Sequence, residues 1–249
     1  MTLKLITALF LTIFSFQVFA QSQTLPVDSF DYTWKGLLVA GDNSIANFDR
    51  GRLDLAAAFE ELGQDPNDQK HYSITKQYLR EGTAVLPTLR NLEQGLSDLN
   101  INPETDGCLV HMTSHGTRGR GFYLAGIGML STRAFNNIIN KHCKDAPTVI
   151  MISACFSGQF INSELQGPNR IILTAARHDV PSFGCSPDYK YTFWDGCILS
   201  ELPNSETWKD LYANVTQCIE RKESQLGANR SFPQAFFGKN VQDLRILNK

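Results

Sequence analysis

The sequence of 249 residues has no basic excess, no long run of like charge and no low-complexity linker. Its net charge is −2, whereas a protein that binds duplex nucleic acid is expected to carry a surplus of Lys and Arg. Because no run of like charge is longer than three residues, acidic and basic tails are excluded as well. We therefore expect no nucleic-acid partner for this protein.

Long apolar runs are absent after residue 20, so the sequence predicts no membrane span in the mature chain. Residues 1–20 have the features of a secretory signal peptide. Lys4 precedes an apolar run that ends at Phe19, and Val18 and Ala20 are the small residues that a signal peptidase requires. A retained anchor is the alternative, but the run is shorter than the roughly 20 residues of a membrane helix. We expect cleavage after residue 20 and a secreted or periplasmic product.

A Cys-x-x-C pair is also lacking among the six cysteines, which argues against a thioredoxin-type redox site. His111 and His115 are four residues apart, but no paired Cys motif accompanies them and the segment resembles a strand, so we expect no metal site. An oxidising compartment would permit disulfides, whose connectivity the spacing does not determine. Two pairings are open alternatives: Cys108 with Cys143, and Cys185 with Cys197.

After a polar lead-in over 21–34, residues 35–249 alternate between predicted strands and helices. Short apolar runs predict strands over 35–41, 71–76, 108–113, 121–124, 148–153 and 170–174, with a last candidate within 232–241. Apolar residues at helical spacing predict helices over 55–62, 86–99, 131–142 and 205–219. Ser131 and Ser205 are the expected N-caps of the last two helices, and a long loop is expected over 176–204.

This alternation predicts a single α/β domain over 35–249, a three-layer sandwich with a mostly parallel central sheet. In such sheets, ligands bind beyond the carboxyl ends of the strands. The segments in which we expect functional residues are therefore the ones that follow the predicted strands: 41–50, 114–121, 153–158 and 175–185.

Two of these segments carry residues suited to nucleophilic catalysis. His115 follows the strand predicted over 108–113, Cys155 follows the strand over 148–153, and one helical crossover joins the two strands. A thiolate is a strong nucleophile, and a nearby His can serve as its acid/base partner. The backbone N–H groups of Gly116 and Cys155 could form an oxyanion hole worth about 3–4 kcal/mol per donor. The sequence therefore predicts acyl transfer through Cys155.

The His-Gly pair at 115–116 and the Ala-Cys-x-Ser-Gly motif at 154–158 together resemble the legumain family of caspase-fold cysteine peptidases. The spacing of 40 residues from His115 to Cys155 suits that family. Further similar segments lie upstream and downstream, at 39–43, 47–48, 174–176 and 182–185. The resemblance therefore covers most of the predicted domain.

This resemblance implies a caspase-like fold and a cysteine endopeptidase that acts on protein or peptide substrates without a metal or organic cofactor. It implies that Cys155 is the nucleophile, that His115 gives a proton to the leaving amine, and that Gly116 helps to stabilise the oxyanion. Asn47 matches a residue with which the family orients the catalytic His.

The expected substrate pocket departs from the family pattern. Asp49 stands where the best-known legumains have an Arg, with Arg50 next to it, and Ser153 stands where they have a Glu. Asp195 is the nearest match to an acidic pocket residue of the family, and Ser182 falls in the downstream match. Cleavage after Asn is therefore not carried over to this chain. Asp49 and Asp195 favour instead a basic substrate side chain through ion pairing.

Other functions are compatible with the same motifs. One is a catalytically silent caspase-fold module that binds peptides. Another is a transpeptidase with the same dyad, in which an amine replaces water as the acyl acceptor, and a third is a thiol hydrolase of small amides. Labelling of the Cys155 thiol separates the silent module from the enzymes.

Overall fold

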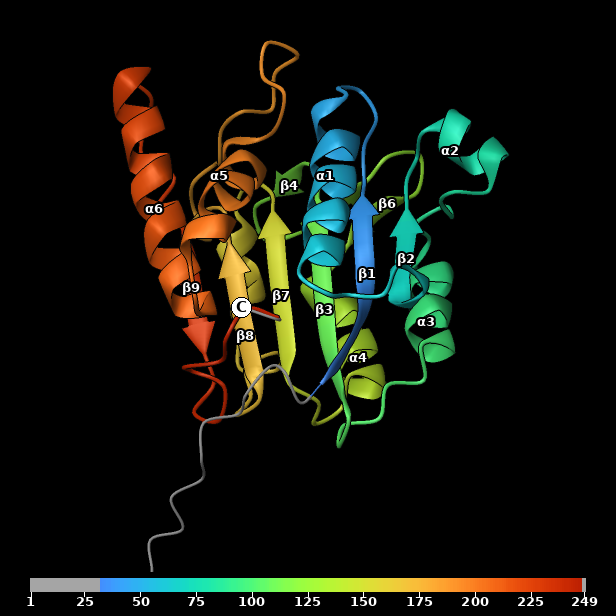
Figure 1. Ribbon diagram of the computed structural model, residues 1–249. Helices are drawn as coiled ribbons and strands as arrows, with labels where there is room; N and C mark the ends of the chain where they lie inside the picture. The colour runs from blue at the N-terminus through green and yellow to red at the C-terminus, as the bar shows by residue number, and fades with distance from the viewer. Residues whose placement is uncertain (1–31, 248–249) are drawn as a thin grey trace, which may run out of the picture.

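The centre of the molecule is a six-stranded sheet of strand order β2-β1-β3-β7-β8-β9, shown in Figure 1. The computed structural model describes residues 32–247, so the predicted signal peptide and most of the polar lead-in lie outside the described residues. Neighbouring strands of the sheet are parallel except β8 and β9, which are antiparallel. Within residues 32–247, no helix is both long and apolar enough to cross a membrane.

The bounds of the elements are as follows. The main sheet contains β1 Thr33–Ala40, β2 Gln69–Tyr72, β3 Asp106–Thr113, β7 Thr148–Ser153, β8 Arg170–Thr174 and β9 Gln234–Phe237. A small antiparallel sheet contains β4 Gly116–Thr117, β5 Gly121–Leu124 and β6 Gly128–Leu130. The α-helices are α1 Asn47–Glu61, α2 Lys76–Glu81, α3 Leu89–Asp98, α4 Thr132–His142, α5 Phe193–Glu201 and α6 Trp208–Gln225. Short 3-10 helices are η2 Pro66–Asp68, η3 Ser157–Phe160 and η4 Leu202–Asn204.

An apolar core lies on each face of the main sheet, because side chains alternate between the two faces along a strand. Leu109 of β3 and Val149 of β7 belong to the core that α1, α5 and α6 cover. Their neighbours Val110 and Ile150 belong to the core that α3 and α4 cover. Strands covered on both faces are continuously apolar, which explains the runs in the sequence. The predicted three-layer α/β sandwich with a mostly parallel sheet is confirmed (Figure 1).

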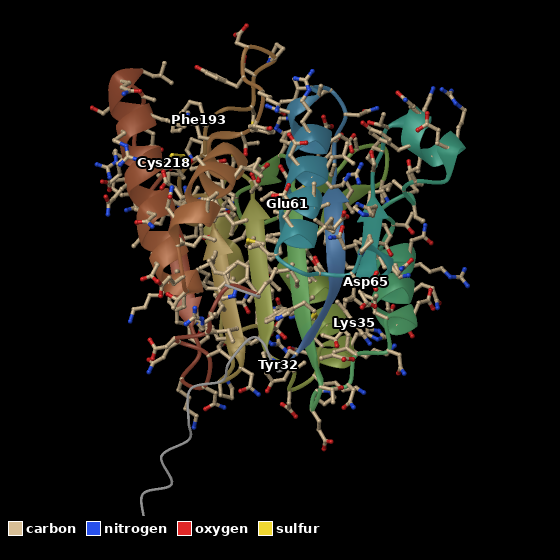
Figure 2. The ribbon with its side chains drawn as sticks, in the orientation of Figure 1. Tyr32, Lys35, Glu61, Asp65, Phe193 and Cys218 are labelled. Atoms are coloured by element: carbon tan, nitrogen blue, oxygen red, sulfur yellow. A yellow bond between two sulfur atoms is a disulfide. The ribbon has the colours of Figure 1, made fainter. Side chains whose placement is uncertain are left out.

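Two disulfides connect elements of these layers. Cys108 at the start of β3 is bonded to Cys143 after α4, which confirms one of the two pairings considered. Cys197 of α5 is bonded to Cys218 of α6, which is labelled in Figure 2. The pairing of Cys185 with Cys197 is therefore wrong, because residue 197 lies on a helix that turns its thiol toward α6, and Cys185 is a free thiol.

Helix α5 lies inside the segment 176–204, which the sequence predicts as a loop. Phe193, Trp194, Cys197 and Ile198 are all buried, because α5 packs against both α1 and α6. A helix that is buried on several sides has no polar stripe, so its sequence lacks the amphipathic period by which a helix is recognised.

Other boundaries also differ from the prediction. Helix α1 begins at Asn47 instead of residue 55, and helix α2 was not predicted. Two further differences have a clear local cause. Helix α6 is capped by Thr207 instead of Ser205: the Thr207 Oγ1 accepts from the N–H of Asp210 at 3.1 Å, and the Asp210 carboxylate accepts from the N–H of Thr207 at 3.0 Å. This reciprocal capping box starts the helix two residues later than expected. Strand β2 ends at Tyr72, because the Ser73 Oγ accepts from the N–H of Thr75 at 3.0 Å and turns the chain away from the sheet.

Candidate active site

Three parallel strands end in register at one edge of the sheet, the upper edge in Figure 1. Ala40 of β1 is paired with Thr113 of β3, and Thr113 is paired with Ser153 of β7. His115 and Cys155 each lie two residues beyond these ends. Neighbouring strands are about 4.8 Å apart, so the register brings the predicted dyad to adjacent places at the edge of the sheet.

The residues after Cys155 form a turn that is anchored to the end of β8. Phe156 has φ = 57°, a left-handed conformation that costs a non-Gly residue about 1–2 kcal/mol. Next to it, the Ser157 Oγ accepts from the N–H of Ala176 at 3.1 Å, and the N–H of Gly158 donates to the carbonyl of Ala176 at 2.8 Å. The Ser and Gly of the motif thus hold the turn that presents Cys155 at the edge of the sheet.

The thiol of Cys155 is half-buried and lies against Ser182. The distance from the Cys155 Sγ to the carbonyl oxygen of Ser182 is 3.5 Å, and the Ser182 Oγ lies 3.7 Å from the same sulfur. Ser182, predicted as a pocket residue, therefore borders the nucleophile directly.

Gly116 crosses close over the backbone of Cys155. A Cβ added to Gly116 would overlap the carbonyl oxygen of Cys155, so this approach requires glycine. In the described part of the chain, the N–H of Cys155 donates to no protein acceptor, and its amide is available to an incoming oxygen. This arrangement suits the oxyanion role that the sequence predicts for these two residues.

The imidazole of His115 is open to solvent, with 42% of its side chain exposed. The ring of Phe48 meets it edge-on at a centroid distance of 5.1 Å, and Tyr123 lies 6.4 Å away on another side. The backbone is fixed from β5, because the N–H of Tyr123 donates to the carbonyl of His115 at 2.9 Å and the Ser114 hydroxyl donates to the carbonyl of Tyr123 at 2.8 Å. The Nε2 atom of His115 lies 4.0 Å from the Oδ1 of Asp42.

Asn47, the predicted orienting residue, is buried at the first residue of α1. Its Nδ2 donates to the carbonyl of Gly184 at 2.7 Å. Among residues 32–247, no hydrogen-bond partner reaches its Oδ1. The contact that Asn47 makes thus anchors the loop of Ser182 to α1.

Two of the predicted pocket residues belong to a buried polar network below the dyad. The Asp195 carboxylate is fully buried: its Oδ1 lies 3.0 Å from the Nε2 of His111, and its Oδ2 accepts from the Thr113 Oγ1 at 2.7 Å. The Ser153 Oγ lies 2.9 Å from the Oγ1 of Thr192, which also accepts from the N–H of Asp195 at 3.0 Å. The network joins the ends of β3 and β7 to the start of α5.

Asp49 is also engaged within the protein. Its Oδ1 pairs with the Arg52 guanidinium at 3.0 Å, and its Oδ2 accepts from the hydroxyls of Ser73 at 2.9 Å and Thr75 at 2.6 Å. Arg50 is exposed on the same helix. The two acidic residues from which the sequence predicts a basic substrate side chain both have internal partners, and these contacts favour structural roles for them.

Cys185 is a second free thiol, in the loop that carries Ser182. Burial raises its pKa to about 12, and the negative charges that Cys155, Asp195 and Asp42 can carry act in the same direction. Cys185 is therefore a neutral thiol at physiological pH, unlike a catalytic nucleophile.

The structure adds Asp42 and Cys185 to the residues around the dyad. The sequence held a signal for Asp42, because it lies two residues after β1 just as His115 and Cys155 lie two residues after their strands. Using that signal requires the register of the strands, which the sequence does not show. Cys185 falls in the segment 175–185, where functional residues are expected, but its loop has no regular structure, so the sequence does not show which side chains lie beside Cys155.

Comparison with known proteins gives two findings. A model of the Peptidase C13 family matches residues 93–243, more than half of the chain, and this stretch contains His115 and Cys155. Among solved structures, the crystal structure of caspase-1 from Spodoptera frugiperda is similar, with a TM-score of 0.59 and 12% sequence identity over 88% of this chain and 93% of that chain. At this identity the likeness shows a caspase-like fold alone. No curated protein sequence matches this chain.

Proposed function

From the premise that this chain belongs to the Peptidase C13 family, the legumain family, we propose that it is an exported cysteine endopeptidase that hydrolyses peptide bonds through Cys155 and His115. The family and the fold make it a cysteine peptidase of caspase-like architecture. The identity of the site residues, the export and the mechanism are the parts that we add.

One observation carries the assignment of the dyad. The in-register pair Thr113 and Ser153 sets His115 and Cys155 side by side at the carboxyl edge of the sheet, where ligands of open α/β folds bind. The thiol is half-buried and the imidazole is partly exposed, so a substrate can approach both.

In the proposed reaction, the Cys155 thiolate attacks the carbonyl carbon of the scissile bond, and the oxyanion that forms accepts hydrogen bonds from the N–H groups of Gly116 and Cys155. The His115 imidazolium gives its proton to the departing amine, which leaves a Cys155 thioester. Water then attacks the thioester, with His115 as the base that takes its proton. The products are the carboxylic acid and the free thiol.

The carbonyl of Ser182 is suited to positioning the substrate. It lies 3.5 Å from the nucleophilic sulfur, where it can accept a hydrogen bond from the backbone N–H of a peptide. Asn47 supports this loop through the carbonyl of Gly184. From Asp49 and Asp195 the sequence predicts a basic residue before the scissile bond. Both carboxylates have internal partners, so we leave this preference out of the proposal, and the peptide panel below tests it.

A panel of fluorogenic peptides tests the function. Residues 21–249 in mild reductant should cleave at least one peptide in a panel that carries Arg, Lys, Asn, Asp or Leu before the bond. Cys155→Ala and His115→Ala should each lose the cleavage, whereas Ser224→Ala, an exposed change on α6, should retain it. Retained cleavage in Cys155→Ala would refute the assignment.

Alkylation separates a silent module from an enzyme with a narrow substrate range. In an active dyad, iodoacetamide should modify Cys155 faster in the wild type than in His115→Ala, even when no peptide of the panel is cleaved. Equal, slow rates in both proteins would favour the silent peptide-binding module.

The two disulfides support the proposal of export, because disulfides persist in oxidising compartments. Expression of the full chain with a C-terminal tag should give an exported product whose N-terminus is Gln21. Retention of the tagged protein in the cytoplasm, with residues 1–20 intact, would contradict this part of the proposal.

A further inference from the structure

Asp42 shares a geometric relationship with the two proposed catalytic residues. The ends of β1, β3 and β7 are aligned through the pairs Ala40 with Thr113 and Thr113 with Ser153. Asp42, His115 and Cys155 each stand two residues beyond these aligned ends, in this spatial order across the sheet edge. In the order of the strand ends, His115 therefore stands between Asp42 and Cys155.

The Asp42 carboxylate is buried and held in place. Only 7% of its side chain is exposed, and its Oδ1 accepts from the N–H of Ser44 at 2.7 Å and from the Ser44 hydroxyl. The same Oδ1 lies 4.0 Å from the Nε2 of His115, an ion-pair distance that is longer than a hydrogen bond. Catalytic contacts are often this long without substrate and tighten in the reacting complex.

Apart from Asp42 and Cys155, the groups described below around the imidazole supply no negative charge. Phe48 of α1 and Tyr123 of β5 present aromatic rings to it. The free thiols of the site are those of Cys155, which follows β7, and Cys185, which follows Gly184. Asn47 has an uncharged side chain, and its Nδ2 donates to the carbonyl of Gly184. Among the residues that the structure describes, Asp42 is the carboxylate within ion-pair distance of His115.

We propose that Asp42 is the residue that orients His115 and stabilises its imidazolium, a positioning role that completes an acid, base and nucleophile arrangement across the three strand ends. The inference rests on the proposed function and deepens it. An acid on the Nε2 side leaves the Nδ1 of the imidazole to Cys155, so the proton that Nδ1 takes from the thiol is the one given to the leaving amine. Asn47 then serves to hold the substrate loop.

Asp42→Asn separates this role from a structural one, because an Asn oxygen can still accept from the N–H of Ser44 while the charge is lost. We expect kcat to fall on the order of 10- to 100-fold with KM within about twofold of the wild type. If Asp42 acts on the imidazolium, the alkaline limb of the pH profile of kcat/KM should also move to lower pH in this variant.

Three matched variants complete the design. Asp42→Glu keeps the charge and should recover part of the lost kcat. Asp98→Asn, the same change at an exposed site at the end of α3, should behave as the wild type. Asn47→Ala should raise KM, because the loop of Ser182 loses its anchor, and should leave the pH profile of kcat/KM unchanged. A shifted pH profile in Asn47→Ala together with an unshifted profile in Asp42→Asn would overturn the proposal.

The pH dependence of Cys155 alkylation keeps this test independent of any substrate. If Asp42 acts on His115, Asp42→Asn should lower the alkylation rate near neutral pH toward the rate of His115→Ala. A rate in Asp42→Asn equal to that of the wild type, with His115→Ala slowed, would refute the role of Asp42 and leave the dyad standing. Equal rates in all three proteins would instead refute the proposed function.

Discussion

The Nε2 of His111 lies 3.0 Å from the Oδ1 of Asp195, and neither side chain has any exposed surface. His111 is on β3 and Asp195 is in the first turn of α5, so this contact joins the sheet to a helix that covers it. A buried polar contact of this kind is costly to break, because the partner left behind has no water to replace it.

Asp195→Asn should therefore reduce stability more than it changes specificity. We expect the free energy of unfolding to fall by about 1–3 kcal/mol in urea titrations, the cost of leaving buried polar groups imperfectly paired. Among cleaved peptides, the ranking of the residue before the scissile bond should stay the same. Asp98→Asn serves as the control for charge. A loss of preference for Arg and Lys at unchanged stability would show instead that Asp195 faces the substrate, as the sequence led us to expect.

The two free thiols should differ sharply in reactivity. The pKa of Cys185 is raised to about 12 by burial, whereas Cys155 follows a strand end beside His115. At pH 7.5 iodoacetamide should label Cys155 in the folded protein and reach Cys185 only after unfolding, as followed by mass spectrometry of the peptides. The folded Cys155→Ala variant should remain unlabelled. Fast labelling of Cys185 in that variant would contradict the burial of its thiol.

His71 predicts a loss of stability in mild acid. Burial and the Arg52 guanidinium lower the pKa of His71 from 6.5 to about 4 in the folded state. The unfolded chain binds this proton near pH 6.5, so unfolding takes up a proton between pH 6.5 and 4, and the free energy of unfolding falls as the pH falls through this window. Urea titrations at several pH values should show this slope.

His71→Asn keeps an acceptor for Arg52 but cannot titrate. The free energy of unfolding of this variant should therefore depend less steeply on pH, by the uptake of one proton. His178→Asn, at an exposed position, is the matched control and should leave the slope as it is in the wild type. The same slope in His71→Asn and in the wild type would assign the acid sensitivity to other groups.

The disulfide between Cys197 and Cys218 should contribute to the stability of the α5–α6 pair. It closes a sequence separation of 21 residues, and a loop of this size corresponds to about 3 kcal/mol in the chain-entropy model. The double variant Cys197→Ala with Cys218→Ala should lose about this amount in urea unfolding. The matched pair Cys108→Ala with Cys143→Ala, with a separation of 35, should lose slightly more. Wild-type stability in both double variants would contradict the prediction.

Local sequence patterns are sufficient to predict three of the strands. The strands predicted over 121–124, 148–153 and 170–174 have the same bounds in the structure, because each is a short and local apolar run. The start of helix α4 is also predicted correctly, because Ser131 is its N-cap and the Ser131 Oγ accepts from the N–H of Ala134. The sequence does not predict helix α5, because a helix buried between α1 and α6 has no polar face and therefore no amphipathic period.

Because both motifs are local, the sequence predicts that His115 and Cys155 follow strand ends, and with this the class of chemistry. The surroundings of the two residues depend on contacts between distant parts of the chain. Asp42 faces His115 because three strands end in register, and the partner of Asp195 is a His 84 residues away. Asn47 reaches Gly184 across 137 residues. Contacts of this range depend on strand register and helix packing, which no local pattern of residues encodes.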